Sequence, residues 1–338
     1  MLARLARVLA LAASVAAAQH PADAADNSFY RGKQIVLTVA SGAGGGYDTY
    51  ARTLARYITK YIPGNPVIVV KNVPGAGGLI AANSLYNATI PDGLTIAALT
   101  NGAAMDPLFG ETAARFDGRK FNWIGSIGKL ENICVTRQGG PITRIEQARA
   151  REITVAASGA TGNSAIMPKI VNRFLGTKFK VISGYSEGSG VTLALERGEV
   201  DGVCGMSYST LKATHSDWFR DHRVNVILQI GLNKLKDLPA VPSALDLVNG
   251  PDKQTLELIL IRQEMGRPFA LPPGVPADRI ATLRRAFEAT MRDRDFIAEA
   301  AKLSLEVDPL TGEQISELLD RAYRAPKPVV AEAAKLAK

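Results

Sequence analysis

The chain has 338 residues, 46% of them hydrophobic, so it can bury a sizeable core and has room for two domains. The formal net charge of +8 at pH 7 comes from scattered lysines and arginines with few aromatic residues between them. This distribution argues against nucleic acid as a partner, whereas a modest positive field helps to collect anionic small molecules.

Residues 1–24 are predicted to be a secretory signal peptide. Arg4 and Arg7 form a positive start and a run of small apolar residues follows them. We expect cleavage after Ala24, with the stretch Ala16-Ala17-Ala18 as the second choice. The apolar run is shorter than the roughly 20 residues that a membrane-spanning helix needs, and no later stretch qualifies. The mature protein is therefore expected to be soluble and exported.

The first hundred residues after this segment alternate strands, glycine-rich loops and helices. Short apolar runs predict strands at 34–40, 67–70 and 95–99. A helix is expected directly after the first glycine-rich loop, and its apolar face is predicted to be Ala51, Leu54, Ala55, Ile58 and Ile62. A second helix is expected at 79–87, after the second glycine-rich loop. Alternating strands and helices with nearly continuous apolar strands are typical of an α/β fold with a parallel sheet.

A second α/β block follows an extended segment at residues 122–138. Its expected elements are a strand at 153–157, a loop at 158–164, a helix at 165–175, a strand at 179–183, a loop at 184–190, a helix ending at 198 and a strand at 200–206. Two such blocks predict two lobes that face each other.

The C-terminal third is expected to return to the first lobe and pack on it. It should contribute a strand at 256–261, a crossing segment at 267–273 and helices at 278–291 and 297–303. A last helix should begin at Thr311, because Gln314 follows at the capping-box spacing. The predicted first lobe is thus discontinuous, with residues 25–130 and 256–338, and the second lobe spans residues 131–255.

The two cysteines and the histidines give little sign of chemistry. Cys134 and Cys204 lie 70 residues apart, which excludes a CxxC motif. Both lie in apolar runs, so two separate buried thiols are favoured, although an oxidising compartment would permit them to pair. His215 and His222 lie in a polar segment and are expected at the surface, so we predict no metal site.

Four glycine-rich loops stand between a strand and a helix. The start of a helix carries unpaired N–H groups and partial positive charge, and glycine lets an anion approach the backbone closely. In an open α/β sheet such loops gather at the carboxyl ends of the strands, where ligands bind. For any single loop, a purely structural role in turns and helix packing stays open.

The loops match neither a nucleotide site nor a catalytic site. Tyr47 stands where a dinucleotide fingerprint needs its third glycine, and the Gly-Lys-Ser/Thr of a phosphate loop is missing. Ser158 and Ser189 lack the GxSxG elbow of a serine nucleophile. We therefore expect no catalytic residue and no cofactor.

A set of short motifs in a fixed order resembles one family. The motifs are GGGYD at 44–48, VVKNVPGAGG at 69–78, PDG at 91–93, ASGATG at 157–162, GEVD at 198–201, LPAVP at 238–242 and ALPPGVP at 270–276. They resemble, over about residues 30 to 330, the extracytoplasmic solute receptors of tripartite tricarboxylate transporters, often called Bug proteins.

The resemblance implies a two-lobed α/β periplasmic binding protein of type II topology with a ligand cleft between the lobes. It implies a monomeric receptor that captures a small organic carboxylate and delivers it to the membrane subunits of a transporter. The alternative is a module of the same fold that passes its ligand to a signalling partner.

Carried over by position, the resemblance also nominates the residues that bind the ligand. The first jaw would be Gly45, Gly46, Tyr47 and Asp48; the second jaw Ser158, Thr161, Gly162 and Asn163; and the wall Gly77, Gly78, Tyr185, Ser189 and Asp201. One departure concerns charge, because Glu187 stands where relatives often carry a lysine. The cleft would then lack one cation.

Overall fold

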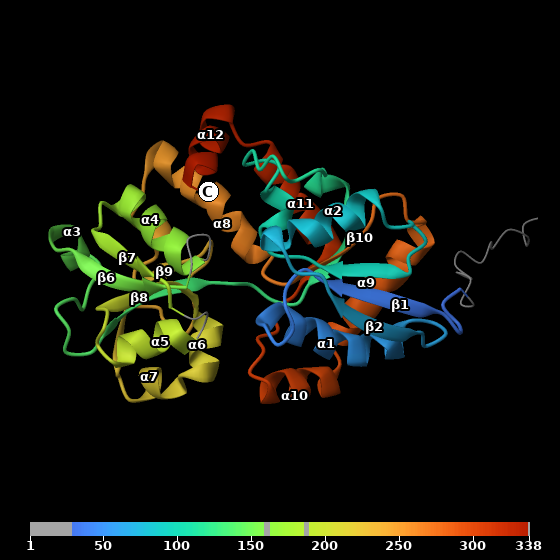
Figure 1. The fold of residues 1–338 in the computed structure, drawn as a ribbon, viewed down its shortest axis with the longest axis horizontal. Coiled ribbons are helices and arrows are strands. Elements are labelled where there is room, and N and C mark those ends of the chain that lie inside the picture. The colour runs from blue at the N-terminus through green and yellow to red at the C-terminus, as the bar shows by residue number, and fades with distance from the viewer. Residues whose placement is uncertain (1–28, 159–162, 186–188, 337–338) are drawn as a thin grey trace, which may run out of the picture.

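The computed structural model describes residues 29–158, 163–185 and 189–336. Within them the chain forms two α/β lobes, each built around one sheet. Figure 1 shows the two lobes side by side, with segments of the chain crossing between them. None of the described helices is both long and apolar enough to cross a membrane.

Sheet A, the sheet of the first lobe, has the strand order β11-β4-β10-β3-β1-β2. Its strands are β1 (Gln34–Val39), β2 (Val67–Asn72), β3 (Thr95–Ala98), β4 (Asn122–Ser126), β10 (Pro268–Leu271) and β11 (Leu310–Thr311). Strands β1, β2 and β3 are parallel, whereas β10 runs antiparallel between β3 and β4. The end of the chain therefore completes a sheet that its beginning starts.

Sheet B, the sheet of the second lobe, has the strand order β7-β6-β8-β5-β9. Its strands are β5 (Asn132–Arg137), β6 (Ile153–Ala157), β7 (Phe179–Ser183), β8 (Gly202–Ser207) and β9 (Val224–Ile230). Strand β6 is parallel to β7 and β8, while β5 is antiparallel to β8 and β9. In each lobe, the carboxyl ends of the parallel strands therefore lie at the same edge of the sheet.

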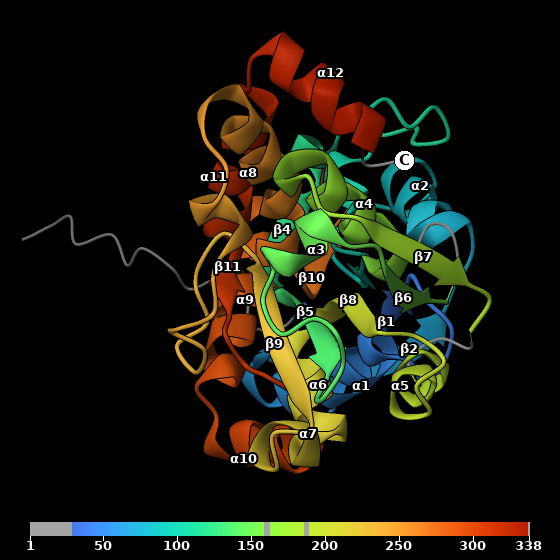
Figure 2. The ribbon, with the colours of Figure 1, turned by 90° about the vertical axis from the view of Figure 1, so that its left-hand side faces the viewer.

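Helices cover both faces of the two sheets. The described α-helices are α1 (Gly46–Ile58), α2 (Leu79–Asn87), α3 (Gln147–Ala150), α4 (Asn163–Leu175), α5 (Ser189–Glu196), α6 (Tyr208–Thr214), α7 (Ser216–Arg220), α8 (Gly250–Glu264), α9 (Ala277–Met291), α10 (Arg294–Lys302), α11 (Gly312–Tyr323) and α12 (Lys327–Leu336). Figures 1 and 2 show α4 on one face of sheet B and α5, α6 and α7 on the other. The predicted capping box of Thr311 and Gln314 is present at the start of α11.

The buried face of α1 is the one that the apolar spacing predicts. Ala51, Leu54 and Ile58 are at most 2% exposed and pack in one cluster with Leu37 of β1. Residues of this face repeat every three or four positions, so they all turn toward the sheet. The outward face carries charge, and Arg56 pairs there with a glutamate of α10.

The prediction of a strand at residues 256–261 is wrong, because these residues lie inside α8. Leu256, Leu258 and Ile261 are at most 4% exposed, so the helix is buried almost all round in this stretch. A short continuous apolar run cannot distinguish a buried strand from a buried helix. The lobe boundary expected after residue 255 would also divide this helix.

The C-terminal helices do not all pack on the first lobe as expected. Helices α9 and α11 contact β4 of sheet A, whereas α12 packs on α8 and on α4 of the second lobe. Arg173 of α4 lies 3.2 Å from Asp252 of α8 and 3.2 Å from Glu332 of α12. Figure 1 accordingly shows α8 and α12 above the junction of the two lobes.

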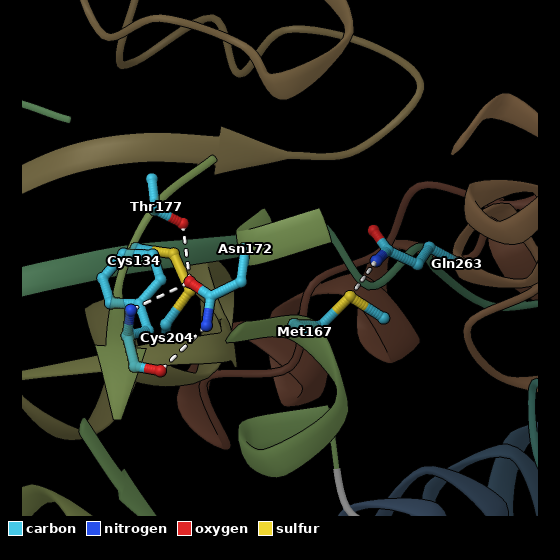
Figure 3. The surroundings of a disulfide bond; sticks show 7 residues. Cys134, Met167, Asn172, Thr177, Cys204 and Gln263 are labelled. Atoms are coloured by element: carbon cyan, nitrogen blue, oxygen red, sulfur yellow. Dashed lines mark hydrogen bonds between the residues drawn. A yellow bond between two sulfur atoms is a disulfide. The ribbon is translucent and has the colours of Figure 1, made fainter. Parts of the chain in front are cut away.

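Cys134 and Cys204 form a disulfide, so the preference for two separate thiols is wrong. The two residues stand directly opposite each other in the register of the neighbouring strands β5 and β8. A sequence separation of 70 residues gives no sign of this pairing. Figure 3 shows the disulfide beside Asn172, whose amide binds Thr177 and both backbone groups of Phe179.

Candidate functional site

The first glycine-rich loop leads from β1 into α1 at the carboxyl edge of sheet A. Gly45 is the N-cap of α1 and is exposed, as is Gly46. Among the described residues no side chain caps this helix, and its first backbone bond runs from the Thr49 N–H to the Gly45 carbonyl. The N–H groups of the first turn therefore offer positive partial charge to an anion from bare backbone.

Asp48 is the residue that holds this loop in shape. Its side chain is 5% exposed and accepts hydrogen bonds from the Gly44 N–H at 2.8 Å, Arg52 Nε at 2.9 Å and Asn72 Nδ2 at 2.9 Å. Burial acts to raise the pKa of Asp48, but the hydrogen bonds from Arg52, Gly44 and Asn72 outweigh it and lower that pKa. Both carboxylate oxygens are thus occupied by protein donors, which leaves the exposed backbone beside Asp48 for a ligand.

Tyr47 is partly buried, and its hydroxyl is fixed by Asn101. That hydroxyl accepts from the Asn101 N–H at 3.0 Å and lies 3.3 Å from Asn101 Oδ1. Sequence reasoning missed Asn101, although its position just after the third parallel strand could have indicated it.

Arg267 is a second residue that sequence reasoning missed. Its guanidinium lies over the rings of Tyr47, at 4.7 Å from the centroid, and Tyr50, at 4.9 Å. It also reaches the glycine loop, because a Cβ at Gly46 would lie 3.4 Å from Arg267 Nη2. No motif indicates Arg267, since only the antiparallel return of β10 brings it to this edge.

Gly77 and Gly78 lie in the second loop, between β2 and α2, and have different environments. A Cβ at Gly78 would lie 2.8 Å from Cγ2 of Thr100, so this glycine permits close packing against the end of β3. Gly77 faces open space and its carbonyl accepts from the Thr100 hydroxyl at 3.2 Å. Of the two, only Gly77 has room for a ligand beside it.

In the second lobe, Ser158 and Asn163 flank the loop that joins β6 to α4. The Ser158 N–H donates to Ser164 Oγ at 3.4 Å, and Asn163 begins α4. The predicted residues Thr161 and Gly162 lie outside the described residues, as does Glu187.

Tyr185 and Ser189 lie at the next junction of the same edge, between β7 and α5. The Tyr185 N–H donates to the Ala157 carbonyl at 3.3 Å, so the two loops of this lobe are neighbours. Ser189 is exposed at the first position of α5. Both residues therefore lie at the same edge of sheet B as Ser158.

Asp201, which was predicted to belong to the wall of the site, does not lie at the edge of sheet B where Ser158 lies. Its carboxylate accepts from the N–H and the hydroxyl of Thr154, both at 2.9 Å. Thr154 lies near the start of β6, whereas Ser158 follows the end of that strand. Four residues of strand separate the two points by about 13 Å. Asp201 therefore ties β8 to β6 at the opposite edge.

A cavity of about 900 Å³ lies between the lobes, beside the first crossing segment. Lys129 and Glu131 of that segment, α6 and the loops at 233–237 and 304–308 line it. Most of its charges are paired, since Lys129 lies 3.0 Å from Asp308 and Lys212 contacts Asp237. Neither Gly46 nor Ser158 lines this cavity, so it is distinct from the glycine loops.

Glu131→Gln is expected to stabilise the protein above neutral pH. Burial, together with the carboxylates of Glu306 and Glu264, raises the pKa of Glu131 to about 7. A raised folded-state pKa means that wild type loses stability as pH rises from about 4.5 to about 7, because the buried carboxyl must then ionise. The amide never ionises, so the variant should gain about 1–3 kcal/mol at pH 8 and nothing at pH 4.

Urea unfolding at pH 4, 6 and 8 measures this difference, with the exposed Glu152→Gln as the control. An equal stability change at all three pH values would contradict the role given to Glu131.

Three comparisons relate the chain to known proteins. The model of the tripartite tricarboxylate transporter family receptor matches residues 50–334. A UPF0065 protein of Bordetella bronchiseptica is 24% identical over 290 residues, which cover 83% of this chain and 79% of that protein.

Solved structures show the same fold at low identity. A TctC solute-binding protein from Polaromonas superposes with a TM-score of 0.70 at 20% identity, covering 91% of this chain and 98% of that one. The periplasmic binding protein BugD gives 0.64 at 21%, covering 91% and 98%. MatC from Rhodopseudomonas palustris, solved with bound malate, gives 0.61 at 19%, covering 90% and 99%. The chain thus has the two-lobed α/β fold of periplasmic binding proteins.

Proposed function

Because the chain belongs to the tripartite tricarboxylate transporter receptor family, we propose that it is a periplasmic receptor that binds a small organic carboxylate and delivers it to the membrane subunits of such a transporter. Residues 1–24 would be its signal peptide, cleaved near Ala24, and the mature protein would act as a monomer. The malate bound to MatC supports a carboxylate as the class of ligand.

The observation that carries the proposal is the uncapped start of α1. The exposed backbone of Gly45 and Gly46 precedes it, and the buried Asp48 fixes the loop by binding the Gly44 N–H. Such a start stabilises an anion without any side chain in direct contact. The first jaw of the site would then be Gly45, Gly46 and the backbone of Tyr47, with Asp48 as the residue that positions them.

The second jaw would come from the matching edge of sheet B. Ser158 and Asn163 flank its loop, Tyr185 and Ser189 stand at the neighbouring junction, and Thr161 and Gly162 belong to it by sequence position. Gly77 extends the wall of the first jaw, whereas Gly78 serves packing. Asp201 lies at the other edge and is left out of the proposed site.

Hydrogen bonds to a charged group contribute about 1.5–3 kcal/mol each. Three or four such bonds would be enough for micromolar affinity, which corresponds to about −8 kcal/mol. An acid that touches both jaws binds the closed arrangement of the lobes better than the open one and so favours closure. The membrane subunits could then distinguish the loaded receptor from the empty one.

Isothermal titration calorimetry with succinate, L-malate, glutarate, adipate and citrate tests this function. We expect at least one of these acids to bind saturably at one site per chain. Gly46→Leu should abolish that binding, because the added side chain covers the first N–H groups of α1. Leucine is a good helix former, and Gly46 does not have a positive φ, so stability should be kept.

Ile90→Ala, an exposed position ahead of the amino end of β3, is the control. Heat signals that do not saturate for any acid, or unchanged binding by Gly46→Leu, would contradict the proposal.

A further inference from the structure

Arg267 lies where the chain crosses back from the second lobe to the first. It precedes β10 directly, and its backbone N–H donates at 3.0 Å to Oγ of Ser126, the last residue of β4. The neighbouring Leu99 N–H, at the end of β3, donates to the Pro268 carbonyl at 3.0 Å. The backbone of Arg267 is therefore fixed at the carboxyl edge of sheet A, beside the first glycine loop.

The guanidinium has unused hydrogen-bonding capacity. Of its five N–H donors, one bonds within the described residues, from Nη1 to the Gly266 carbonyl at 2.9 Å. Its Nε is buried and has no hydrogen-bond partner in the described parts of the chain. An unsatisfied buried donor on a charged group costs free energy, so an acceptor at this place would stabilise the structure.

Arg267 also has no carboxylate partner among the described residues, unlike Arg52 and Arg262. Arg52 pairs with Asp48 at 2.9 Å, and Arg262 lies 3.8 Å from Asp106. The rings of Tyr47 and Tyr50 contact the guanidinium and help to hold it in place. They provide cation–π attraction but supply no negative charge to neutralise it.

The Arg267 guanidinium, which has no carboxylate partner in the described part of the chain, lies beside the start of α1. Nη2 lies 3.4 Å from the place that a Cβ at Gly46 would occupy, and Gly46 is the first residue of α1. The absence of a side chain at this position leaves room beside the guanidinium for a small anion. One carboxylate could therefore accept from Arg267 and from the first turn of α1 together.

We propose that Arg267 is a ligand-binding residue that selects for ionised acids by holding one carboxylate of the ligand against the start of α1. The proposal rests on the function proposed above and adds to it a charge requirement. Neutral N–H groups can donate to amides and esters as well as to acids, whereas a guanidinium that has no carboxylate partner among the described residues favours a ligand with a full negative charge.

The test compares Arg267→Gln with wild type by calorimetry, using L-malate, succinate, glutarate and adipate as probes. Loss of a charge-assisted bidentate contact should weaken the acid that binds wild type by about 10- to 100-fold. The affinities of wild type and Arg267→Gln for the primary amides of the same acids should differ by less than about threefold.

Arg285→Gln is the matched control, because it removes the same charge from an exposed position on α9 of the same lobe. Its affinity for the acids should equal that of wild type.

Thermal unfolding without ligand identifies a variant that fails to fold. In that case Arg267→Lys replaces Arg267→Gln; it keeps the charge but loses the planar pair of donors, and should weaken acid binding about 3- to 10-fold. If wild type binds an acid and the folded Arg267 variants bind it equally well, Arg267 is not a ligand-binding residue and the proposed function stands. If wild type binds none of the acids, both proposals fail.

Discussion

Asp48→Ala is expected to destabilise the protein by about 1–3 kcal/mol and to abolish carboxylate binding. The change leaves the Gly44 N–H, Arg52 Nε and Asn72 Nδ2 without their shared acceptor at a side chain that is 5% exposed. The donors around this buried carboxylate lose their acceptor, but the cost stays below that of a fully buried ion pair because Arg52 is 45% exposed and water can replace part of its contact. The glycine loop loses the α1 side chain that holds the Gly44 N–H.

The effect should depend on pH in a definite direction. Hydrogen bonds lower the pKa of Asp48 in the folded state despite its burial, so its stabilising contribution is present above the unfolded pKa of about 3.9. It is lost as pH falls through the folded-state pKa. The stability difference between wild type and Asp48→Ala should therefore be constant between pH 5 and 8 and shrink below about pH 4.

Urea unfolding across this pH range, with calorimetry at pH 7, measures both effects. Asp278→Ala is the matched control, because Asp278 also lies in the first turn of a helix, α9, but is exposed. It should cost less than about 1 kcal/mol, the usual contribution of a helix dipole to an exposed carboxylate. Equal effects of the two substitutions would show that the network around Asp48 is unimportant.

Removing the disulfide between Cys134 and Cys204 is expected to lower stability by about 2–4 kcal/mol. The bond closes a long loop, with a sequence separation of 70 residues, and so restricts the unfolded chain. It also joins β5 to β8 in the middle of sheet B, where both residues are at most 1% exposed.

The measurement is urea unfolding of wild type and Cys134→Ala/Cys204→Ala, each with and without dithiothreitol. Reductant should destabilise wild type to nearly the level of the double variant and leave the double variant unchanged. Since the bond is buried, reduction should require unfolding or long incubation. Identical midpoints for wild type and the double variant would exclude a stabilising disulfide.

Much of the fold can be predicted from the local sequence. The strand at 153–157 and the helix at 79–87 have the predicted bounds, and the capping box at Thr311 forms. These elements follow from apolar spacing and from short-range polar patterns, which act within a few residues. The first glycine loop and the start of α1 follow in the same way, although α1 ends at Ile58 and not at residue 62.

The sequence by itself therefore determined the α/β pattern, the two blocks and the glycine loops, because each depends on neighbours along the chain. Only the tertiary structure decided which distant residues meet. In the tertiary structure Cys134 pairs with Cys204 across two strands, and residues 256–261 form a buried helix. Arg267 lies beside the start of α1. Sheet register and the antiparallel return of β10 fix these contacts, and no local pattern reports them, because the residues that touch are separated by up to 221 positions.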